Sequence, residues 1–236
     1  PLHLAPAMWR LGYLSWREKL AIGKSLRQLV STCVNDDDGR SIGEWLAQQG
    51  QSKQAIDRFW SIVLVSALGE SLDRTSVVAA RKVFLDGFLG HRDGNHVFIP
   101  QAPLGTIYDG VKRWLENHNV AIRFEHHIDR LESNDRRVTQ MEFNNQQAEF
   151  DDYIVAVPWH AIGRLFNEQT WPKLCSHTDS IEGSPITSVH LWFDRPITDL
   201  LNAVLVDRLT QWVFAVEGNY YQVVISASRD IVKRPK

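Results

Sequence analysis

Hydrophobic positions along the chain change their spacing near residue 100. In the first part, apolar residues recur every three or four positions, a period that predicts helices. We expect these helices at residues 15–30, 41–50, 52–69 and 73–90. Two of them open with a capping-box pair, Ser15 with Glu18 and Ser41 with Glu44. In such a pair each side chain bonds the backbone N–H of the other residue, which marks the start of a helix.

The later part of the chain predicts one more helix, ending near Asn119, and then mostly strands. Runs rich in β-branched and aromatic residues, separated by polar turns, are typical of strands. They lie at residues 120–133, 137–145, 148–157, 186–193, 203–207, 211–218 and 220–228. Pro158 ends the third run and opens a short helix. Helices followed by strands, one short helix and more strands predict an α+β fold with a largely antiparallel sheet.

The run at residues 186–193 has the clearest alternation. One face of this strand would carry Ile186, Ser188, His190 and Trp192, while residues 187, 189, 191 and 193 would point the other way. Pro196 cannot donate to a sheet ladder, so the strand should end in the cluster Trp-Phe-Asp-Arg-Pro at residues 192–196.

Five aromatic residues are the candidate ligand contacts. Phe59 and Trp60 begin a stretch, residues 59–68, that is apolar nearly all round and should be buried. Trp192, Trp212 and Phe214 belong to later strands. These side chains would wall a pocket for a large hydrophobic ligand, or else form an ordinary core, and the sequence leaves both readings open.

Composition and charge exclude several classes of protein. A formal net charge of −2 without a long basic run gives no sign of nucleic-acid binding. No apolar run reaches the eighteen residues of a membrane span. Cys33 and Cys175 are too few for a disulfide framework, so we expect buried thiols. His126 and His127 are adjacent and would point to opposite faces of a strand, so no metal site is expected.

Catalytic residues cannot be assigned from these patterns. The chain contains neither a Gly-x-Ser-x-Gly elbow nor a Gly-x-x-x-x-Gly-Lys phosphate loop. It begins PLHLAPAMWR, without Met, and we expect this start to be an internal point of a longer protein.

Six segments of the sequence, taken together in their order along the chain, form a recognisable pattern. They are GEWLAQQGQSKQAIDRFWSIVLVSALGE, PQAPLGTIYDGVKRWLE, HHIDRLE, DDYIVAVPW, SPITSVHLWFDRPI and QWVFAVEG. In this order the chain resembles the squalene-associated, FAD-dependent desaturase-like proteins, the hydroxysqualene dehydroxylases of hopanoid synthesis. These are close to phytoene desaturases within the flavin amine oxidase superfamily. The resemblance covers nearly the whole chain, and the WFDRP and QWVF clusters are its most specific parts.

The resemblance implies an FAD cofactor for the whole protein and a set of cofactor-binding residues. Ile128 matches a residue whose backbone N–H and C=O contact the adenine ring, and Pro158 and Trp159 match the turn near the flavin. The Gly-x-Gly-x-x-Gly loop and the closing Gly-Asp segment of the family do not occur in this chain. Because that loop lets backbone N–H groups approach the pyrophosphate, this chain alone should not hold FAD tightly and should be inactive.

The resemblance also implies a domain layout and a reaction. Residues 1–99 would be the helical part of a substrate domain, residues 100–160 part of an FAD-binding domain, and residues 161–236 the antiparallel part of the substrate domain. The whole enzyme would convert hydroxysqualene to squalene. Alternatives are a phytoene desaturase-like or other amine-oxidase-superfamily flavoenzyme, and a lipid-binding module without enzymatic activity.

Residues 9–30 combine apolar positions with Arg10, Arg17, Lys19, Lys24 and Arg27. A basic amphipathic helix is typical of a segment that lies on an anionic membrane, and also of an ordinary surface helix. We expect a cytoplasmic protein. If this helix lies on a membrane, the protein would be in peripheral contact with the membrane's inner face.

Overall fold

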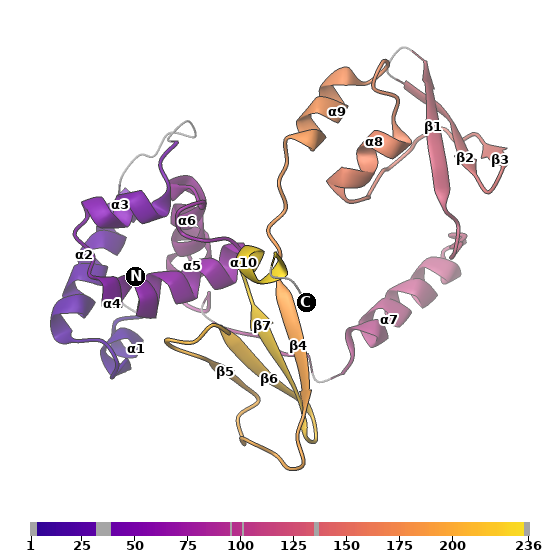
Figure 1. Ribbon diagram of the computed structural model, residues 1–236. Helices are drawn as coiled ribbons and strands as arrows, with labels where there is room; N and C mark the ends of the chain where they lie inside the picture. Colours follow the sequence, from indigo (N-terminus) through magenta and orange to yellow (C-terminus); the bar gives the residue numbers. More distant parts are fainter. Residues whose placement is uncertain (1–3, 32–38, 95, 101, 135–136, 234–236) are drawn as a thin grey trace. The chain divides into compact units, whose positions relative to one another are not determined.

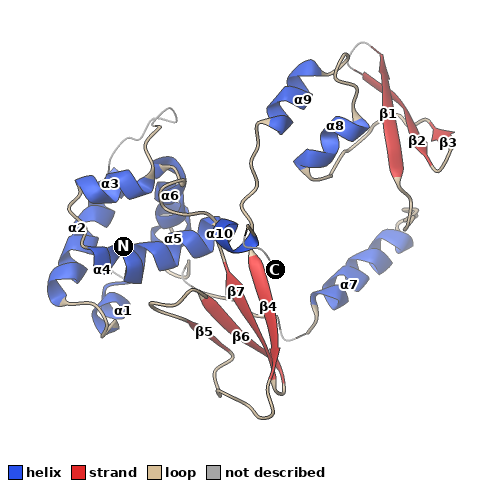
Figure 2. Ribbon diagram, viewed as in Figure 1, coloured by secondary structure: helices blue, strands red, loops and turns tan. Residues whose placement is uncertain are grey.

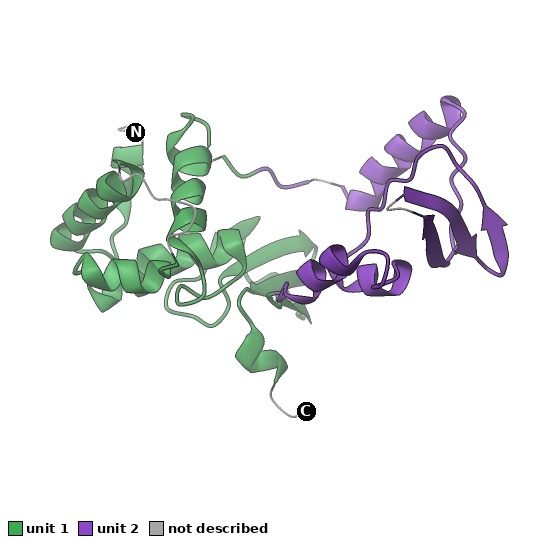
Figure 3. Cartoon of the chain, turned by 90° about the horizontal axis from the view of Figure 1, so that it is seen from above, with its two compact units in different colours: residues 1–97, 184–236 green, residues 98–183 purple. Residues whose placement is uncertain are grey.

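The computed structural model describes residues 4–31, 39–94, 96–100, 102–134 and 137–233. The chain forms two compact units (Figure 3). Unit 1 contains Pro1–Val97 and Ser184–Lys236, and unit 2 contains Phe98–Gly183. Unit 1 is therefore built from two stretches of chain that are separated in sequence by the whole of unit 2. The two units are described separately below.

The first stretch of unit 1 is helical, as the apolar spacing predicts (Figure 1). Its elements are α1 (Ala5–Arg10), α2 (Trp16–Ser31), α3 (Ile42–Gln48), α4 (Lys53–Ala55), the π-helical turn η2 (Ile56–Trp60), α5 (Ser61–Leu68), α6 (Val77–Lys82) and the π-helical turn η3 (Val83–Leu89). The helix predicted over 73–90 begins later, because Ser76 caps it by accepting a hydrogen bond from the Ala79 N–H.

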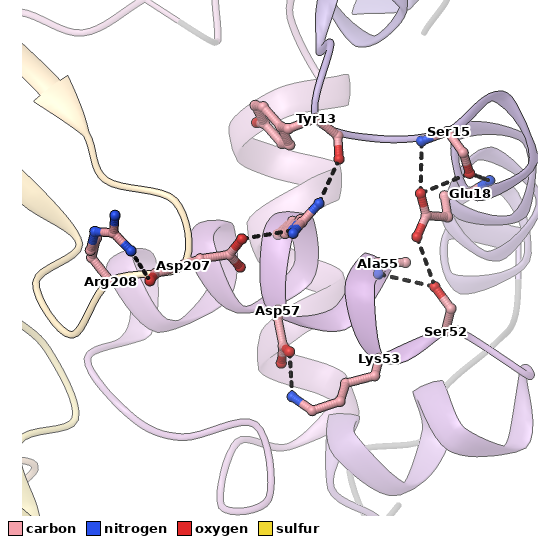
Figure 4. Close-up of polar contacts among 10 residues, drawn as sticks. Tyr13, Ser15, Glu18, Ser52, Lys53, Ala55, Asp57, Asp207 and Arg208 are labelled. Carbon is pink, nitrogen blue, oxygen red and sulfur yellow. Dashed lines mark hydrogen bonds and ion pairs between the residues drawn. The ribbon is translucent and has the colours of Figure 1, made fainter.

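Both predicted capping boxes are present. The Ser15 N–H donates to Glu18 Oε2 at 2.7 Å, and the Glu18 N–H donates to Ser15 Oγ at 3.3 Å (Figure 4). Ser41 and Glu44 make the same reciprocal pair at α3. The backbone N–H and the hydroxyl of Ser15 hold the pKa of the Glu18 carboxyl below its usual range, and the Ser52 hydroxyl adds a third hydrogen bond. Glu18 therefore joins the start of α2 to the start of α4.

The core of the helical part centres on Trp60, which has no exposed surface. Its ring makes edge contacts with Trp45 and Phe84 at centroid distances of 6.5 and 5.3 Å. Its indole Nε1 donates to Gln51 Oε1 at 2.9 Å, and Gln51 Nε2 donates in turn to Ser25 Oγ at 2.9 Å. The Gln51 amide thus accepts a hydrogen bond from the Trp60 indole and donates one to the Ser25 hydroxyl, so both buried polar groups are paired inside an apolar core.

Replacing Gln51 tests this network. We expect Gln51→Leu to lower the free energy of unfolding by about 1–3 kcal/mol, because it leaves the Trp60 N–H buried without an acceptor. Urea unfolding followed by circular dichroism measures the change. The control is to make Gln51→Leu in a Trp60→Phe variant, which lacks the indole N–H. In that variant Gln51→Leu should lower the free energy of unfolding by clearly less. An equal cost in both backgrounds would contradict the role given to this hydrogen bond.

The second stretch of unit 1 forms a four-stranded sheet. The strands are β4 (Thr187–Trp192), β5 (Asn202–Val204), β6 (Trp212–Glu217) and β7 (Tyr220–Ile225), followed by the short helix α10 (Arg229–Val232). They lie in the order β4-β7-β6-β5 with every neighbouring pair antiparallel (Figure 2). This confirms the predicted antiparallel sheet, and β4 ends at Trp192, the first residue of the WFDRP cluster.

Helices and sheet meet at the end of α5. Gly69 ends that helix in the left-handed region, with φ of +70°, and its carbonyl accepts hydrogen bonds from the Ala227 N–H at 3.1 Å and from the Ser184 hydroxyl. The next residue, Glu70, accepts two hydrogen bonds from Arg229, at 2.6 Å from Nη2 and 3.0 Å from Nε. This junction, residues 69–70 with 184 and 227–229, joins the two stretches of unit 1.

The hydrogen bonds from Arg229 lower the pKa of the Glu70 carboxyl from 4.5 to about 2, against the opposing effect of burial. A carboxyl whose pKa falls on folding stabilises the fold above its unfolded pKa, and this contribution disappears as the pH falls from about 4.5 towards 2. Because the pair is partly solvated, we expect it to contribute about 1–2 kcal/mol.

Glu70→Gln should therefore lower the free energy of unfolding by about 1–2 kcal/mol at neutral pH, and the difference from the original chain should shrink below pH ~4. Urea unfolding across this pH range measures it. Glu149→Gln, at an exposed carboxylate in unit 2, is the matched control and should leave the profile unchanged. A constant difference at every pH would argue against the ion pair.

Unit 2 consists of one longer helix, a small antiparallel meander and short helices that pack on the first strand of the meander. Its elements are α7 (Leu104–Asn117), β1 (Ile128–Asn134), β2 (Arg137–Phe143), β3 (Gln146–Ala148), the 3-10 turn η4 (Trp159–Ala161), α8 (Ile162–Leu165) and α9 (Pro172–Asp179). Leu131 of β1 packs with Leu165, Phe166 and the thiol residue Cys175 in one buried cluster. Cys175 is thus a buried free cysteine, as predicted, whereas Cys33 lies outside the described residues.

Two predictions for this region differ from the structure. Strand β1 begins only at Ile128, so residues 120–127 are not a strand and the alternation expected for His126 and His127 does not apply. Residues 153–157, expected as a buried strand, pair with no strand among the described residues, and Ile154 is 96% exposed. A run that is apolar on both faces needs sheet neighbours on both sides, and the described residues do not supply them.

Residues 161–183 belong to unit 2. Leu165, Phe166 and Cys175 bury their side chains against Leu131 there. Within the described ranges, no helix is both long and apolar enough to cross a membrane.

Candidate functional site

The candidate site is one face of the sheet in unit 1. Residues that pair directly across antiparallel strands point to the same side, so the strand register defines this face. We call it the aromatic face; its side chains are Ser188, His190, Trp192, Trp212, Phe214, Tyr220, Gln222 and Val224. Three predicted ligand contacts, Trp192, Trp212 and Phe214, therefore lie on the same surface although they come from two strands.

One half of the aromatic face is a stack of three rings. Trp192 and Tyr220 are directly paired, with ring centroids 4.8 Å apart and an interplanar angle of 10°. His190 stacks on the same tyrosine at 5.8 Å, and its Nδ1 lies 2.5 Å from the phenol oxygen. Trp192 is 72% exposed. The stack thus offers a flat aromatic surface that carries one imidazole–phenol pair.

The other half holds a second ring pair. Trp212 and Phe214 stack with centroids 5.6 Å apart at an angle of 9°. The indole Nε1 of Trp212 donates to Ser66 Oγ on α5 at 3.0 Å, which fixes the ring against the helices. Between the two ring groups, Gln222 Nε2 donates to Ser188 Oγ at 2.7 Å.

The opposite face of the sheet carries the two buried residues of β7. Tyr221 is 1% exposed and Ile225 is 6% exposed. The Tyr221 hydroxyl accepts a hydrogen bond from the Ile197 N–H at 3.1 Å, and its ring contacts Phe193 edge-on at 5.7 Å. The segment that follows β4 therefore covers this side around Tyr221, while Val189 on the same side is 39% exposed.

Sequence reasoning missed Tyr220 and Gln222. Both lie in β7, which was predicted as a strand, but their neighbours across the sheet depend on register between segments 30 residues or more apart. The only local signal is the two-residue turn before Tyr220, in which Gly218 has φ of +54°. Such a turn indicates a tight hairpin and fixes the pairing of β6 with β7.

The remaining predicted contacts, Phe59 and Trp60, lie in the helical part. Trp60 is fully buried, so it offers no surface to a ligand in this structure. Phe59 is partly buried and stacks on Phe84 at 6.2 Å with an angle of 17°. The structure thus places both residues in core packing, apart from the aromatic face.

The three predicted cofactor contacts lie in unit 2. Ile128 begins β1, pairs with Phe143 and packs against the cluster that includes Ile162. Pro158 precedes the η4 turn, and Trp159 begins it. The indole Nε1 of Trp159 donates to the Ile181 carbonyl at 3.1 Å. Ile128 thus packs on the small core of unit 2, and the Trp159 ring is hydrogen-bonded to the segment after α9.

With this geometry in place, comparison with known proteins identifies the family. The sequence profile of the flavin containing amine oxidoreductases matches residues 3–218. The chain belongs to that family. Its mixture of helices and antiparallel sheets is accordingly a fragment of the flavin amine oxidase fold.

Curated relatives within the family include 15-cis-phytoene desaturases. The Arabidopsis thaliana protein is 24% identical over 207 residues, which is 83% of this chain and 36% of that protein. The Synechococcus elongatus protein is 24% identical over 204 residues, 79% of this chain and 42% of that protein. The chain therefore spans only about two fifths of the length of these relatives.

Solved structures agree at the level of the fold. An oxidoreductase from Methanosarcina mazei has a TM-score of 0.71 at 13% identity, with 93% of this chain and 54% of that chain covered. A putrescine oxidase bound to putrescine has a TM-score of 0.70 at 13% identity, covering 94% and 55%. At such identities the likeness concerns the fold alone.

Membership in this family implies a flavin cofactor, but the described residues do not fit a complete flavin site. A dinucleotide needs a glycine loop between a parallel strand and a helix. The sequence contains no Gly-x-Gly-x-x-Gly, and the apolar run at 153–157 has no strand partners in the described part of the chain. The apolar face of α7 is exposed as well, at Leu104, Ile107, Tyr108, Val111 and Trp114.

We therefore expect this 236-residue chain to be purified without flavin. The reason is that no backbone cradle for the pyrophosphate is present in its sequence. Visible absorbance of the purified chain, before and after incubation with FAD and gel filtration, measures retention. A full-length phytoene desaturase treated in parallel is the positive control. Flavin that stays bound to the chain through gel filtration would show the expectation to be wrong.

Proposed function

We propose that this chain is the substrate-binding portion of a flavin-dependent oxidoreductase that acts on a squalene-type isoprenoid. The reaction we favour is the conversion of hydroxysqualene to squalene. The observation that supports a long apolar substrate most directly is the aromatic face, where Trp192, Tyr220, Trp212 and Phe214 form two ring groups on one surface.

The chemistry of such a substrate matches this surface. Squalene-type chains are flexible hydrocarbons with double bonds, and stacked aromatic rings bind them by apolar burial and dispersion. The second support is sequence similarity to phytoene desaturases, whose names state a long isoprenoid as substrate, across 83% of the chain. The squalene-type interpretation rests on the WFDRP and QWVF clusters. The first contributes Trp192 to the aromatic face, and the second contributes Trp212 and Phe214.

The residues of this chain would bind, orient and desolvate the isoprenoid. Trp192 and Phe214 would hold the chain against the sheet and exclude water. The His190–Tyr220 pair would provide the polar point on that wall, able to donate a hydrogen bond to the hydroxyl of hydroxysqualene. Redox chemistry in this family belongs to the cofactor, and no step through it is assigned to these residues.

Two alternatives remain open. The first is a phytoene desaturase-like or other amine-oxidase-type reaction on the same scaffold, which the curated relatives favour. The second is a lipid-binding module without catalysis, for which the aromatic face would serve equally well. Incubation of the flavin-loaded full-length protein with hydroxysqualene and with phytoene, followed by product analysis, separates the three functions.

In that full-length protein, we expect Trp192→Ala to raise the KM for hydroxysqualene about tenfold or more, because burying an aromatic ring against the substrate contributes about 1.5–3 kcal/mol. Trp192→Phe is the matched variant and should keep most of the affinity, since a ring remains to stack on Tyr220. Steady-state kinetics measure both. Equal loss in the two variants, or no loss in either, would remove the aromatic face as the substrate surface.

A further inference from the structure

The start of unit 1 exposes large apolar side chains that the proposed substrate site does not use. Trp9 of α1 is 55% exposed, and Trp16 and Leu20 of α2 are 59% and 54% exposed. Tyr13, in the link between the two helices, is 39% exposed. We call these four residues the α1–α2 surface. Large apolar side chains grouped on a surface are typical of an interaction site.

The arrangement of α2 explains why Trp16 and Leu20 point outward. Its buried residues, Glu18, Ile22, Ser25 and Leu29, follow helical spacing and define one face. Trp16, Leu20, Lys24 and Arg27 follow the same three- and four-residue spacing on the opposite face. The outer face therefore begins with two apolar side chains and continues with two cationic ones.

Charge on this segment is strongly one-sided. Residues 4–31 contain five basic residues, Arg10, Arg17, Lys19, Lys24 and Arg27, although the whole chain has a net charge of −2. The single acidic residue of the segment is Glu18. Its carboxylate is turned into the capping box and towards Ser52 (Figure 4), and the residue is only 9% exposed. The outer side of the segment thus presents cations without neighbouring carboxylates from its own helices.

Cations and aromatic rings are in direct contact on this surface. Lys19 Nζ lies 5.7 Å from the centroid of the Trp9 ring and donates to the Trp9 carbonyl at 2.9 Å. The Arg17 guanidinium lies 5.3 Å from the Trp16 ring. Such pairs place positive charge at the level of the indole rings.

From these observations we infer that the α1–α2 surface binds an anionic phospholipid bilayer at its interface. Indole and phenol rings favour the headgroup region of a membrane. Basic side chains at the same level are attracted to anionic lipids. The helices would lie in the plane of the interface, since none of them in the described ranges can span a membrane. The inference does not depend on the proposed substrate or on bound flavin.

Vesicle co-sedimentation of the purified chain tests the inference. We expect binding to vesicles of phosphatidylcholine mixed with phosphatidylglycerol, much weaker binding to phosphatidylcholine alone, and a decrease with added salt. Lys24→Glu/Arg27→Glu should reduce the binding constant at least about tenfold, because two attractive charges become repulsive. Trp16→Ala/Leu20→Ala should reduce it on both kinds of vesicle. All four positions are exposed or on the outer face, and circular dichroism checks that the variants fold.

The matched control is α7, which also exposes apolar residues but carries Asp109 and Glu116 beside Lys112 and Arg113. Leu104→Ala/Trp114→Ala should leave vesicle binding unchanged. Absence of binding to anionic vesicles, or unchanged binding by the α2 variants, would overturn the inference. A dimer that Trp16→Ala/Leu20→Ala converts to a monomer, without vesicle binding, would instead identify the α1–α2 surface as a contact between copies and would also overturn it.

Discussion

The junction at Gly69 and Glu70 is the constraint on which unit 1 depends. Two stretches of chain, separated by all of unit 2, meet where α5 ends and where β4 begins and β7 ends. The Gly69 carbonyl accepts from two segments that lie more than a hundred residues away, and Arg229 holds the Glu70 carboxylate. Together with the hydrogen bond from Trp212 to Ser66, these bonds attach the sheet to the helices. The left-handed conformation of Gly69 lets the chain turn there without a Cβ clash.

This attachment gives the sheet its two different faces. Tyr221 and Ile225 are buried on one side, and the aromatic face lies on the other. Trp212 belongs to the aromatic face, and its indole N–H donates a hydrogen bond to Ser66 of α5. The helices therefore hold one edge of the candidate site in place. A surface that combines flat rings with a single His190–Tyr220 pair is suited to a long apolar molecule with few polar groups.

Unit 2 exposes apolar side chains that its own described residues do not cover. The run at 153–157 is apolar on both faces, yet Ile154 is almost fully exposed. The chain spans 36% of the Arabidopsis thaliana relative, and a parallel strand needs neighbours that the described residues do not provide. The prediction of a buried strand was therefore wrong for this structure, because apolar composition does not show whether sheet neighbours are present. The same reasoning applies to the exposed apolar side of α7.

The sequence by itself determined the features that depend on neighbours three or four residues away, or on alternation. The capping boxes of Ser15 and Ser41 and the two faces of β4 are of this kind, because their partners are fixed by local geometry. Only the tertiary structure decided that Trp60 lies in the core and that Trp192 stacks on Tyr220. Those outcomes depend on register and packing between distant segments, and an apolar or aromatic residue suits a core and a ligand surface equally well.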